Sequence, residues 1–385
     1  MATVTLKRTI PLLDLAALHQ PLREDLIAEI TRVVDSQKFI MGEDVKQLEQ
    51  QIARYSGTRF AVACASGSDA LFLALVATGV QPGDRVVTTA YSFFATAGAI
   101  SRAGAVPVFV DIDPLTYNIE PGLLSDALSR NPLAKAVIPV HLFGACADMD
   151  PILEAAREHS CAVIEDGAQA IGAEYKGRKA QCLGDVGCIS FFPSKNLGGF
   201  GDGGMLTTDD EGLARKLTAL RAHGSLKKYY HEWVGINSRL DTLQAAVLKV
   251  KLPRLDSWTA CRQRNADQYR RLLRDSGAPV VLPVATAYQT RHVYNQFVIR
   301  CEKRDELQRW LKENGVSTEV YYPLPLHLQP CYQYLGYREG DFPESEKAAK
   351  QSLALPVHPA MAADDITYVC ELISLFCHEA LGEVK

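Results

Sequence analysis

Residues 162–169 read Ala-Val-Ile-Glu-Asp-Gly-Ala-Gln, an apolar run that ends in two adjacent carboxylates, Glu165 and Asp166. Such a short apolar run, closed by a turn, is typical of a buried strand in a parallel sheet. Similar runs alternate with amphipathic stretches from about residue 58 to 220. The expected strands are 60–64, 85–89, 106–110, 136–139, 162–165, 188–192 and 204–208. This alternation predicts an α/β domain with three layers around a mostly parallel sheet.

Helices with polar and apolar faces are expected between most of these strands, for example at 68–78 and 149–159. Two more amphipathic helices are expected before the sheet, at 21–35 and 43–55. We expect this pair to pack on the large domain or on a partner.

A long helical region is expected over residues 238–273, with an interruption at Pro253. It leads into a smaller C-terminal α+β unit. We therefore divide the 385-residue chain into a large domain, residues 1–252, and a small domain, residues 253–385.

The composition, 47% hydrophobic and 22% charged residues, is that of an ordinary soluble globular protein. A net charge of -4 gives no reason to expect nucleic-acid binding. The ten cysteines form no C-x-x-C pair and no zinc-site spacing, so we expect free thiols and no metal site. Neither a signal-peptide core nor an apolar stretch of membrane-spanning length is present, and we expect a cytoplasmic protein without membrane contact.

The segment Gly199-Phe200-Gly201-Asp202-Gly203-Gly204 satisfies the dinucleotide-binding pattern G-x-G-x-x-G. That pattern binds a pyrophosphate only where it follows a strand and opens a helix. Here it precedes the strand expected at 204–208. We interpret its glycines as a tight loop beside Lys195.

The segment Ser66-Gly67-Ser68-Asp69-Ala70 lies between an expected strand and an expected helix. Free N–H groups and the helix dipole favour an anion at such a place, where Gly67 allows close approach and Ser68 offers a hydroxyl. The alternative is that Ser68 only caps the helix.

Two further residues follow expected strands and could carry chemistry. Asp166, at the carboxyl edge of the sheet, needs a cationic partner if it is buried, and a protonated pyridine nitrogen would serve; otherwise it is a solvated loop acid. Lys195, in Ser190-Phe191-Phe192-Pro193-Ser194-Lys195-Asn196, has apolar and small neighbours. Desolvation would make its amine a nucleophile for Schiff-base chemistry, whereas the alternative is a surface lysine.

Five motifs, taken in their order along the chain, resemble those of the DegT/StrS family of nucleotide-sugar aminotransferases. They are Ser-Gly-Ser-Asp-Ala, Glu-Asp-Gly-Ala-Gln, Ser-x-x-Pro-Ser-Lys-Asn, Gly-Asp-Gly-Gly and Gly-Ile-Asn-Ser-Arg-Leu-Asp (235–241). The resemblance runs from about Pro11 to about Pro359. It implies a pyridoxal-phosphate (PLP) enzyme of the aspartate-aminotransferase fold, fold type I, acting as a homodimer with shared active sites.

The resemblance also assigns site residues. Lys195 matches the lysine that carries the cofactor, and Asp166 matches the acid that pairs with its pyridine nitrogen. Phe93 matches the aromatic side chain that stacks on the ring, and Gln169 matches a ring contact. The cofactor phosphate is assigned to Gly67, Ser68, the Asp69 amide, Ser190, and Asn237 of the neighbouring subunit.

On the substrate side, residues 320–330 resemble the loop of members that act on 3-keto sugars, which points to Tyr321, Tyr322 and His327. Many relatives have His-Tyr where this chain has Tyr321-Tyr322. Arg239 matches a position near the substrate, where it could bind the carboxylate of glutamate or of a uronate, or form an ion pair with Asp241.

The expected reaction is amino transfer from an amino acid, with L-glutamate the expected donor, to a keto group of a nucleotide-linked hexose, at C3. The alternatives are a 4-keto sugar aminotransferase, a pyridoxamine-phosphate-dependent sugar dehydratase, and a non-catalytic regulator. Dehydratases of the family typically replace the lysine at position 195 with histidine, whereas this chain keeps Lys195.

Overall fold

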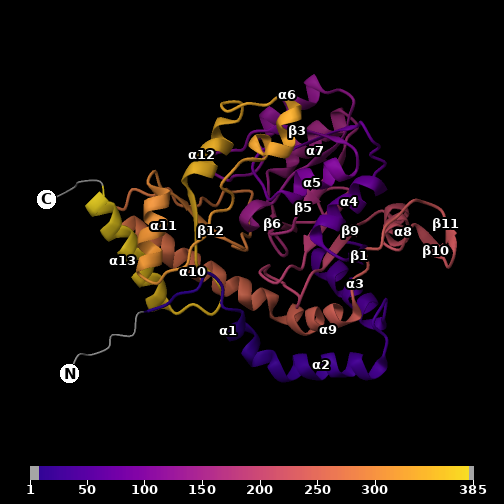
Figure 1. The fold of residues 1–385 in the computed structure, drawn as a ribbon, viewed down its shortest axis with the longest axis horizontal. Coiled ribbons are helices and arrows are strands. Elements are labelled where there is room, and N and C mark those ends of the chain that lie inside the picture. The colour runs from indigo at the N-terminus through magenta and orange to yellow at the C-terminus, as the bar shows by residue number, and fades with distance from the viewer. Residues whose placement is uncertain (1–7, 381–385) are drawn as a thin grey trace.

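The computed structural model describes residues 8–380 and contains a seven-stranded sheet with helices on both faces (Figure 1). Its strands are β1 (Phe60–Cys64), β2 (Arg85–Thr89), β3 (Val106–Val110), β4 (Ala134–Ile138), β5 (Ala162–Asp166), β8 (Val186–Ser190) and β9 (Gly204–Thr208). Their order across the sheet is β1-β9-β8-β5-β4-β2-β3, and within it β9 alone runs antiparallel to its neighbours. The predicted mostly parallel sheet is confirmed.

Two of the predicted strands are displaced along the chain. Strand β4 begins two residues earlier than expected and ends before Pro139, which has no N–H to donate to the sheet. Strand β8 covers residues 186–190 rather than 188–192. Phe191 donates its N–H to Gly203 O, in the loop before β9, and the chain then turns at Pro193. The sheet therefore ends at Ser190, and the loop that follows carries Lys195.

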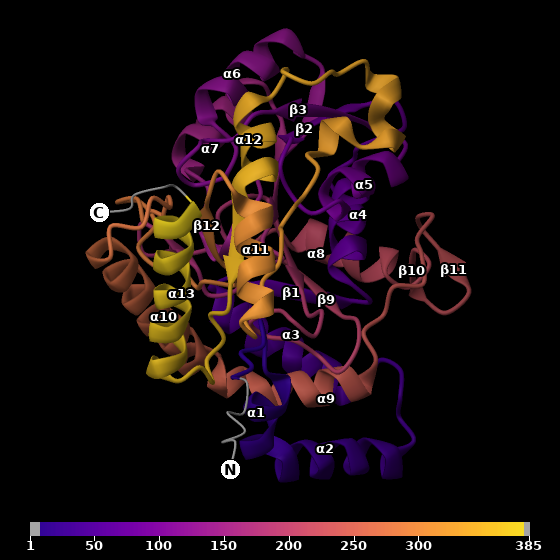
Figure 2. The same cartoon turned by 60° about the vertical axis from the view of Figure 1, so that its left-hand side comes forward.

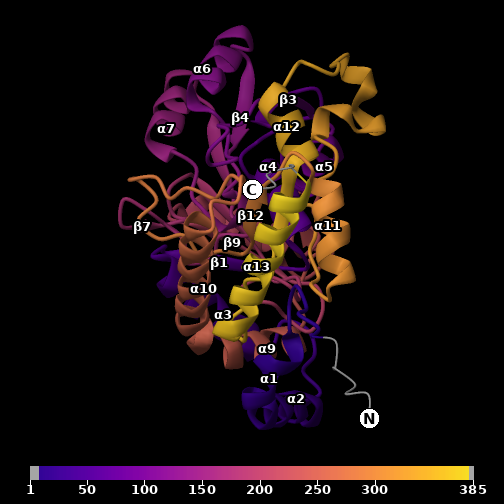
Figure 3. The same ribbon diagram turned by 90° about the vertical axis from the view of Figure 1, so that its left-hand side faces the viewer.

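Helices cover the two faces of the sheet and make the three predicted layers (Figure 3). On one face lie α4 (Gly67–Ala77), α5 (Ala95–Arg102) and α8 (Glu211–Leu220); on the other lie α6 (Pro121–Arg130) and α7 (Met149–Glu158). Side chains alternate along each strand. Val163 of β5 thus joins the core under α6 and α7, whereas Ile164 joins the core under α4, α5 and α8. Both faces are buried, which explains the continuous apolar runs.

The N-terminal helices pack on a long helical region that follows the sheet. These elements are α1 (Leu15–His19), η1 (Gln20–Leu22), α2 (Arg23–Ser36), α3 (Glu43–Ser56), α9 (Thr242–Lys251), η3 (Leu252–Arg254) and α10 (Leu255–Asp275). Helix α2 lies against α9 through Leu26 and Val247, at the bottom of Figure 1. The predicted interruption at Pro253 is confirmed, since the chain forms the 3-10 turn η3 there.

A second core lies in the C-terminal part of the chain. It combines α10 with β12 (Phe297–Arg300), α11 (Arg304–Glu313), β13 (Ser352–Leu355) and α13 (Ala363–Ala380). Ile10 also belongs to this core, and its backbone exchanges hydrogen bonds with Gly315 and Ser317, which the sequence did not indicate. The predicted domain boundary at residues 252 and 253 falls within η3 and stays a prediction.

The remaining elements are short. They are η2 (Leu142–Gly144), β6 (Glu174–Tyr175), β7 (Arg178–Lys179), β10 (Ser225–Lys227), β11 (Tyr230–His231), η4 (Leu326–Leu328), η5 (Pro330–Leu335) and α12 (Pro343–Gln351). The hairpin β10–β11 projects from the body of the protein (Figure 2). The ten cysteines are free thiols, as predicted. Within residues 8–380, no helix combines the length and apolarity needed to cross a membrane.

Candidate active site

A cavity of about 330 Å³ lies where β1, β5 and β8 end. Nine of the residues predicted for the site line it: Gly67, Ser68, Phe93, Asp166, Gln169, Ser190, Lys195, Tyr321 and Tyr322. All nine belong to segments that the sequence analysis identified, and these segments are far apart in the chain. The carboxyl ends of parallel strands meet at one edge of a sheet, which explains why they converge.

Lys195 enters the cavity from the loop after β8. Its backbone N–H donates to Phe192 O at 2.9 Å. Removal of the amine from bulk water lowers the pKa of Lys195 to about 8, against the opposing effect of the Asp166 charge. A larger fraction of neutral amine is therefore present near neutral pH than in an exposed lysine.

The glycines after Lys195 form a tight loop, as predicted, and lead into strand β9. A Cβ atom on Gly198 would lie 2.3 Å from Pro193 O, so a side chain would force the loop apart. Gln244 Oε1 also accepts the N–H of Phe200 at 2.7 Å. The dinucleotide-binding interpretation of this segment is excluded by the strand that follows it.

Asp166 ends β5 with a side chain that is almost fully buried. Its Oδ2 accepts from Thr96 Oγ1 at 2.7 Å, and its Oδ1 accepts from the Ala168 N–H at 3.2 Å. Ser92 Oγ in turn lies 2.9 Å from Thr96 Oγ1. These neutral donors fix the carboxylate without neutralising its charge. Sequence reasoning missed Thr96, although it lies only three residues after Phe93.

Gly67 and Ser190 lie against each other at the start of α4. A Cβ on Gly67 would be 2.7 Å from the Ser190 Cβ, so only glycine fits there. Ser66, not Ser68, is the N-cap residue: its Oγ accepts the Asp69 N–H at 3.1 Å. The alternative interpretation, in which Ser68 only caps the helix, is therefore wrong, and Ser68 lines the cavity. The N–H groups of the first helical turn have no intrahelical acceptor and favour an anion.

Aromatic side chains form the opposite wall of the cavity. Phe93 is half-exposed, and its ring centre lies 5.8 Å from that of Tyr322. Gln169 joins two segments here, because its Nε2 donates to Tyr322 Oη at 3.0 Å and its Oε1 accepts the Phe143 N–H at 2.7 Å. Tyr91 Oη accepts the Tyr322 N–H at 2.8 Å and positions the substrate-side loop.

Four predicted residues do not line this cavity. Asp69 directs its carboxylate to Arg102 and its amide to Ser66, so the Asp69 amide is already satisfied. Asn237 is exposed and accepts the Nε–H of Arg239 at 3.1 Å. Arg239 forms no ion pair with Asp241, and its expected role in binding a substrate carboxylate stays a prediction. His327 differs from the expectation within the subunit: its side chain is fully buried, bonded to Glu346 at 3.1 Å and packed on Phe342, and it does not line the cavity.

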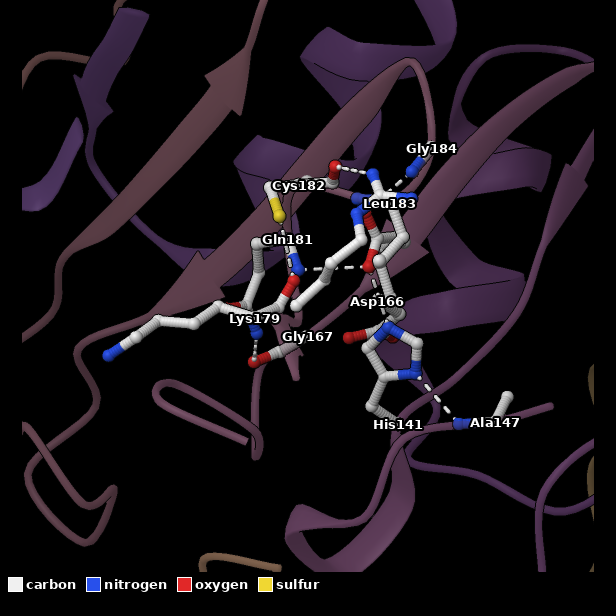
Figure 4. A network of polar contacts seen from close by, with 12 residues as sticks. His141, Ala147, Asp166, Gly167, Lys179, Gln181, Cys182, Leu183 and Gly184 are labelled. Atoms are coloured by element: carbon white, nitrogen blue, oxygen red, sulfur yellow. Dashed lines mark hydrogen bonds and ion pairs between the residues drawn. The ribbon is translucent and has the colours of Figure 1, made fainter. Parts of the chain in front are cut away.

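A buried polar network lies next to Asp166, at the end of β5 (Figure 4). Glu165, the residue before Asp166, accepts hydrogen bonds from His141 Nε2 at 2.8 Å and from the N–H groups of Gln181, Leu183 and Gly184 at 2.7–2.9 Å. The Ala147 N–H can only donate, so His141 Nδ1 accepts it and the ring proton is on Nε2. Burial alone would raise the pKa of Glu165, but the bonds from His141 and the backbone outweigh it and lower the pKa.

These residues fit pyridoxal phosphate. Any side chain at position 67 would fill the space beside Ser190, and the hydroxyl-bearing residues Ser68 and Ser190 both line the cavity. The buried carboxylate of Asp166 forms no ion pair with a cation of the described residues. Lys195 supplies an amine with a lowered pKa in the same cavity. Phosphate, pyridine nitrogen and aldehyde thus each meet a suitable group.

Comparisons with known proteins agree with this chemistry. The DegT/DnrJ/EryC1/StrS aminotransferase family matches residues 20–374. A Geobacillus stearothermophilus relative named pleiotropic regulatory protein is 50% identical over 95% of this chain and 98% of its own. An Acidithiobacillus ferrooxidans relative named UDP-N-acetyl-3-dehydro-alpha-D-glucosamine 3-aminotransferase is 41% identical over 97% and 100%. The crystal structure of S. venezuelae DesV has a TM-score of 0.92 and 41% identity, covering 96% and 98%.

The lowered pKa of Lys195 predicts how cofactor binding depends on pH. Only the neutral amine can attack an aldehyde, so the rate at which the apo-protein binds pyridoxal phosphate should rise with a midpoint near pH 8. The Asp166→Asn variant should have a lower midpoint, because the Asp166 charge raises the pKa. Stopped-flow absorbance measures both rates. A midpoint near 10.5, the ordinary value for lysine, would contradict the prediction.

The Glu165→Gln variant should lower the free energy of unfolding by roughly 2–6 kcal/mol, because the new NH₂ group must face two buried donors. Glu154→Gln, an exposed change in α7, is the matched control and should shift it by less than about 0.5 kcal/mol. The folded-state pKa of Glu165 is lowered. Its stabilisation is thus complete above the unfolded-state value of about 4.3 and is lost as pH falls through the folded-state value. Urea titrations should show that the difference in the free energy of unfolding between the wild type and Glu165→Gln becomes smaller in acid. A difference that stays constant from neutral to acidic pH would contradict this.

Proposed function

The chain belongs to the DegT/DnrJ/EryC1/StrS aminotransferase family, and we propose that it transfers the amino group of L-glutamate to the C3 keto group of a nucleotide-linked hexose. The observation that carries the proposal is the single cavity in which Lys195, with its lowered pKa, and Asp166 lie with the Gly67–Ser190 cradle. The net exchange turns glutamate and a keto sugar into 2-oxoglutarate and an amino sugar.

The roles of the residues follow from their chemistry. When bound, pyridoxal phosphate withdraws into its ring the electrons released at the substrate carbon. Asp166 would hold a proton at the pyridine nitrogen, and Thr96 keeps its carboxylate turned to that side. The Lys195 amine would take a proton from the α-carbon of the substrate and return it to the C4′ atom of the cofactor. Phe93 would cover the ring, with Gln169 beside it. Ser68 and Ser190 would bind the phosphate.

The preference for C3 is supported by the Acidithiobacillus ferrooxidans relative, whose name specifies a 3-dehydro sugar and a 3-aminotransferase. Tyr321 and Tyr322 line the cavity that holds Lys195, and we propose that they contact the sugar. The alternative, amino transfer to a 4-keto sugar, is tested by comparing the two keto sugars as substrates. The dehydratase alternative lacks support, because Lys195 is retained and lies in the cavity.

The regulatory alternative draws on the Geobacillus stearothermophilus relative, which is named a pleiotropic regulatory protein. A protein that had only a regulatory role would have no need of an amine with a lowered pKa opposite a buried carboxylate. The retained cavity therefore favours catalysis.

The substrate prediction is tested with purified protein, L-glutamate and two nucleotide sugars, one carrying a 3-keto and the other a 4-keto group. We expect amination of the 3-keto sugar and no detectable amination by Lys195→Ala, with products identified by mass spectrometry and NMR. Amination of the 4-keto sugar only would defeat the C3 assignment. Failure of glutamate and other amino acids to convert the bound cofactor to its amine form would favour the regulatory role.

We further propose a homodimer in which Asn237 contributes to the cavity of the neighbouring subunit. Asn237 and Arg239 lie outside their own cavity, after a hairpin that projects from the body (Figure 2). Large apolar side chains are exposed on this projection and near the first helices, including Tyr229 and Val234 at 81% and 96% and Ile40 at 50%. Exposed apolar surface of this kind marks an interface.

Complementation between two inactive variants tests the shared site. Lys195→Ala and Asn237→Ala should each be strongly impaired. After subunit exchange, half of the dimers are hybrids with one intact site, so about a quarter of the wild-type activity should return. No recovery in a mixture shown by mass spectrometry to contain hybrid dimers would place Asn237 outside the neighbouring site.

A further inference from the structure

A second large cavity lies in the C-terminal part of the chain. Its volume is about 370 Å³, within the range of small-molecule sites, roughly 300–1,000 Å³. Its walls come from β12, α12 and α13 and from the segments next to them (Figure 2). None of its lining residues lines the Lys195 cavity, so the two cavities are separate.

Arg300, at the end of β12, lines this cavity and carries an unsatisfied guanidinium. The residue is 8% exposed, and within residues 8–380 its guanidinium forms no hydrogen bond. Its ion pair with Glu344 is loose, because Nη1 lies 3.9 Å from Oε2. Both Arg300 Nε and Glu344 Oε2 are buried without a hydrogen-bond partner. The pair therefore leaves the donors of Arg300 unused.

The other buried arginines are satisfied. Arg221, Arg262 and Arg304 are 3%, 4% and 8% exposed, and each donates hydrogen bonds to at least two oxygen atoms of the chain. A buried charged donor without an acceptor is costly. Unsatisfied buried polar groups also indicate a bound polar molecule. Arg300 thus differs from its counterparts by lacking an acceptor, in a cavity large enough to hold one.

Positive charge dominates the lining of this cavity. Lys303 and Lys347 line it together with Arg300, and Glu302 is the only acid among the described residues that do so. Arginine offers a planar fork of donors, and lysine offers an ammonium with three donors. Three cations around one cavity suit a doubly charged anion with several oxygens better than a single carboxylate.

The cavity also has apolar walls. Val281 and Phe376 line it, as do Cys301 and Cys377. Burial raises the pKa of both thiols, which therefore stay neutral and behave as small apolar groups. An inorganic ion would leave these walls in contact with water, whereas an organic group would cover them. The lining thus suits an anionic group that is attached to an apolar part.

We propose that this cavity binds a phosphate monoester of a small organic molecule. The phosphate accepts hydrogen bonds from the Arg300 guanidinium and from the ammonium groups of Lys303 and Lys347. The organic part lies against Val281 and Phe376. The site goes beyond the proposed aminotransferase function and does not depend on it, because it shares no lining residue with the Lys195 cavity.

Phenyl phosphate is the probe, since it joins a phosphate to an apolar ring. It is titrated calorimetrically into holo-protein, in which the cofactor already fills its own phosphate site, and we expect saturable binding. Arg300→Gln should raise the Kd by about tenfold to 100-fold, because charged hydrogen bonds are lost. Lys312→Gln, an exposed change on α11 outside the cavity, is the matched control and should leave the Kd unchanged.

A second variant covers the case in which Arg300→Gln does not fold. Lys347 is exposed, and Lys347→Glu places a negative charge beside the phosphate, so the Kd should rise by at least about tenfold. Lys312→Glu is its control and should not change the Kd.

Two results would overturn the proposal. One is the absence of saturable binding to the wild type. The other is a Kd that neither Arg300→Gln nor Lys347→Glu changes, which would place the probe at another site, such as the one for the nucleotide sugar. Benzoate is titrated in parallel, and binding as tight as that of phenyl phosphate would overturn the assignment of a phosphate monoester.

Discussion

Two neighbouring carboxylates at the end of β5 determine how the active cavity is built. Side chains alternate along a strand, so Glu165 and Asp166 point to opposite sides. Glu165 joins the chain after β4, through His141, to the chain before β8, through the N–H groups of residues 181, 183 and 184. Asp166 is free to face the cavity. Because β8 leads to Ser190 and Lys195, the Glu165 carboxylate fixes the strand from which both of these cavity-lining residues follow.

Much of this arrangement could be predicted because it depends on local patterns. Continuous apolar runs identified the strands, and five of the seven kept at least their first residue. The motifs around Ser68, Asp166 and Lys195 each follow a strand, so topology alone brought them to one edge. The boundaries of β4 and β8 were displaced because Pro139 and the turn at Pro193 act on hydrogen bonding, which hydrophobicity does not report.

Other features depend on contacts between distant segments and carry no local signal. Thr96 meets Asp166 across 70 residues, and Gln169 meets Tyr322 across 153. His327 belongs to the substrate-side loop, yet its side chain is buried against Glu346 and Phe342 and does not line the cavity. Ser66 rather than Ser68 became the helix cap because the helix begins one residue before the expected start. A motif thus located the region, while packing decided which of its side chains reached the cavity.

The basic groups near the cavity show why residue type matters for each role. Lys195 and Lys251 both have a pKa lowered to about 8 by burial, but only Lys195 lies in the cavity, whereas Lys251 donates to Gly198 O and supports the loop. A lysine can lose its proton and act as a nucleophile. An arginine in similarly buried surroundings keeps its proton, so Arg262 stays cationic while it donates to the carbonyl oxygens of Tyr294 and Asn295. Burial thus gives two lysines similarly lowered pKa values, and the surroundings of each amine decide whether it faces the cavity or supports a loop.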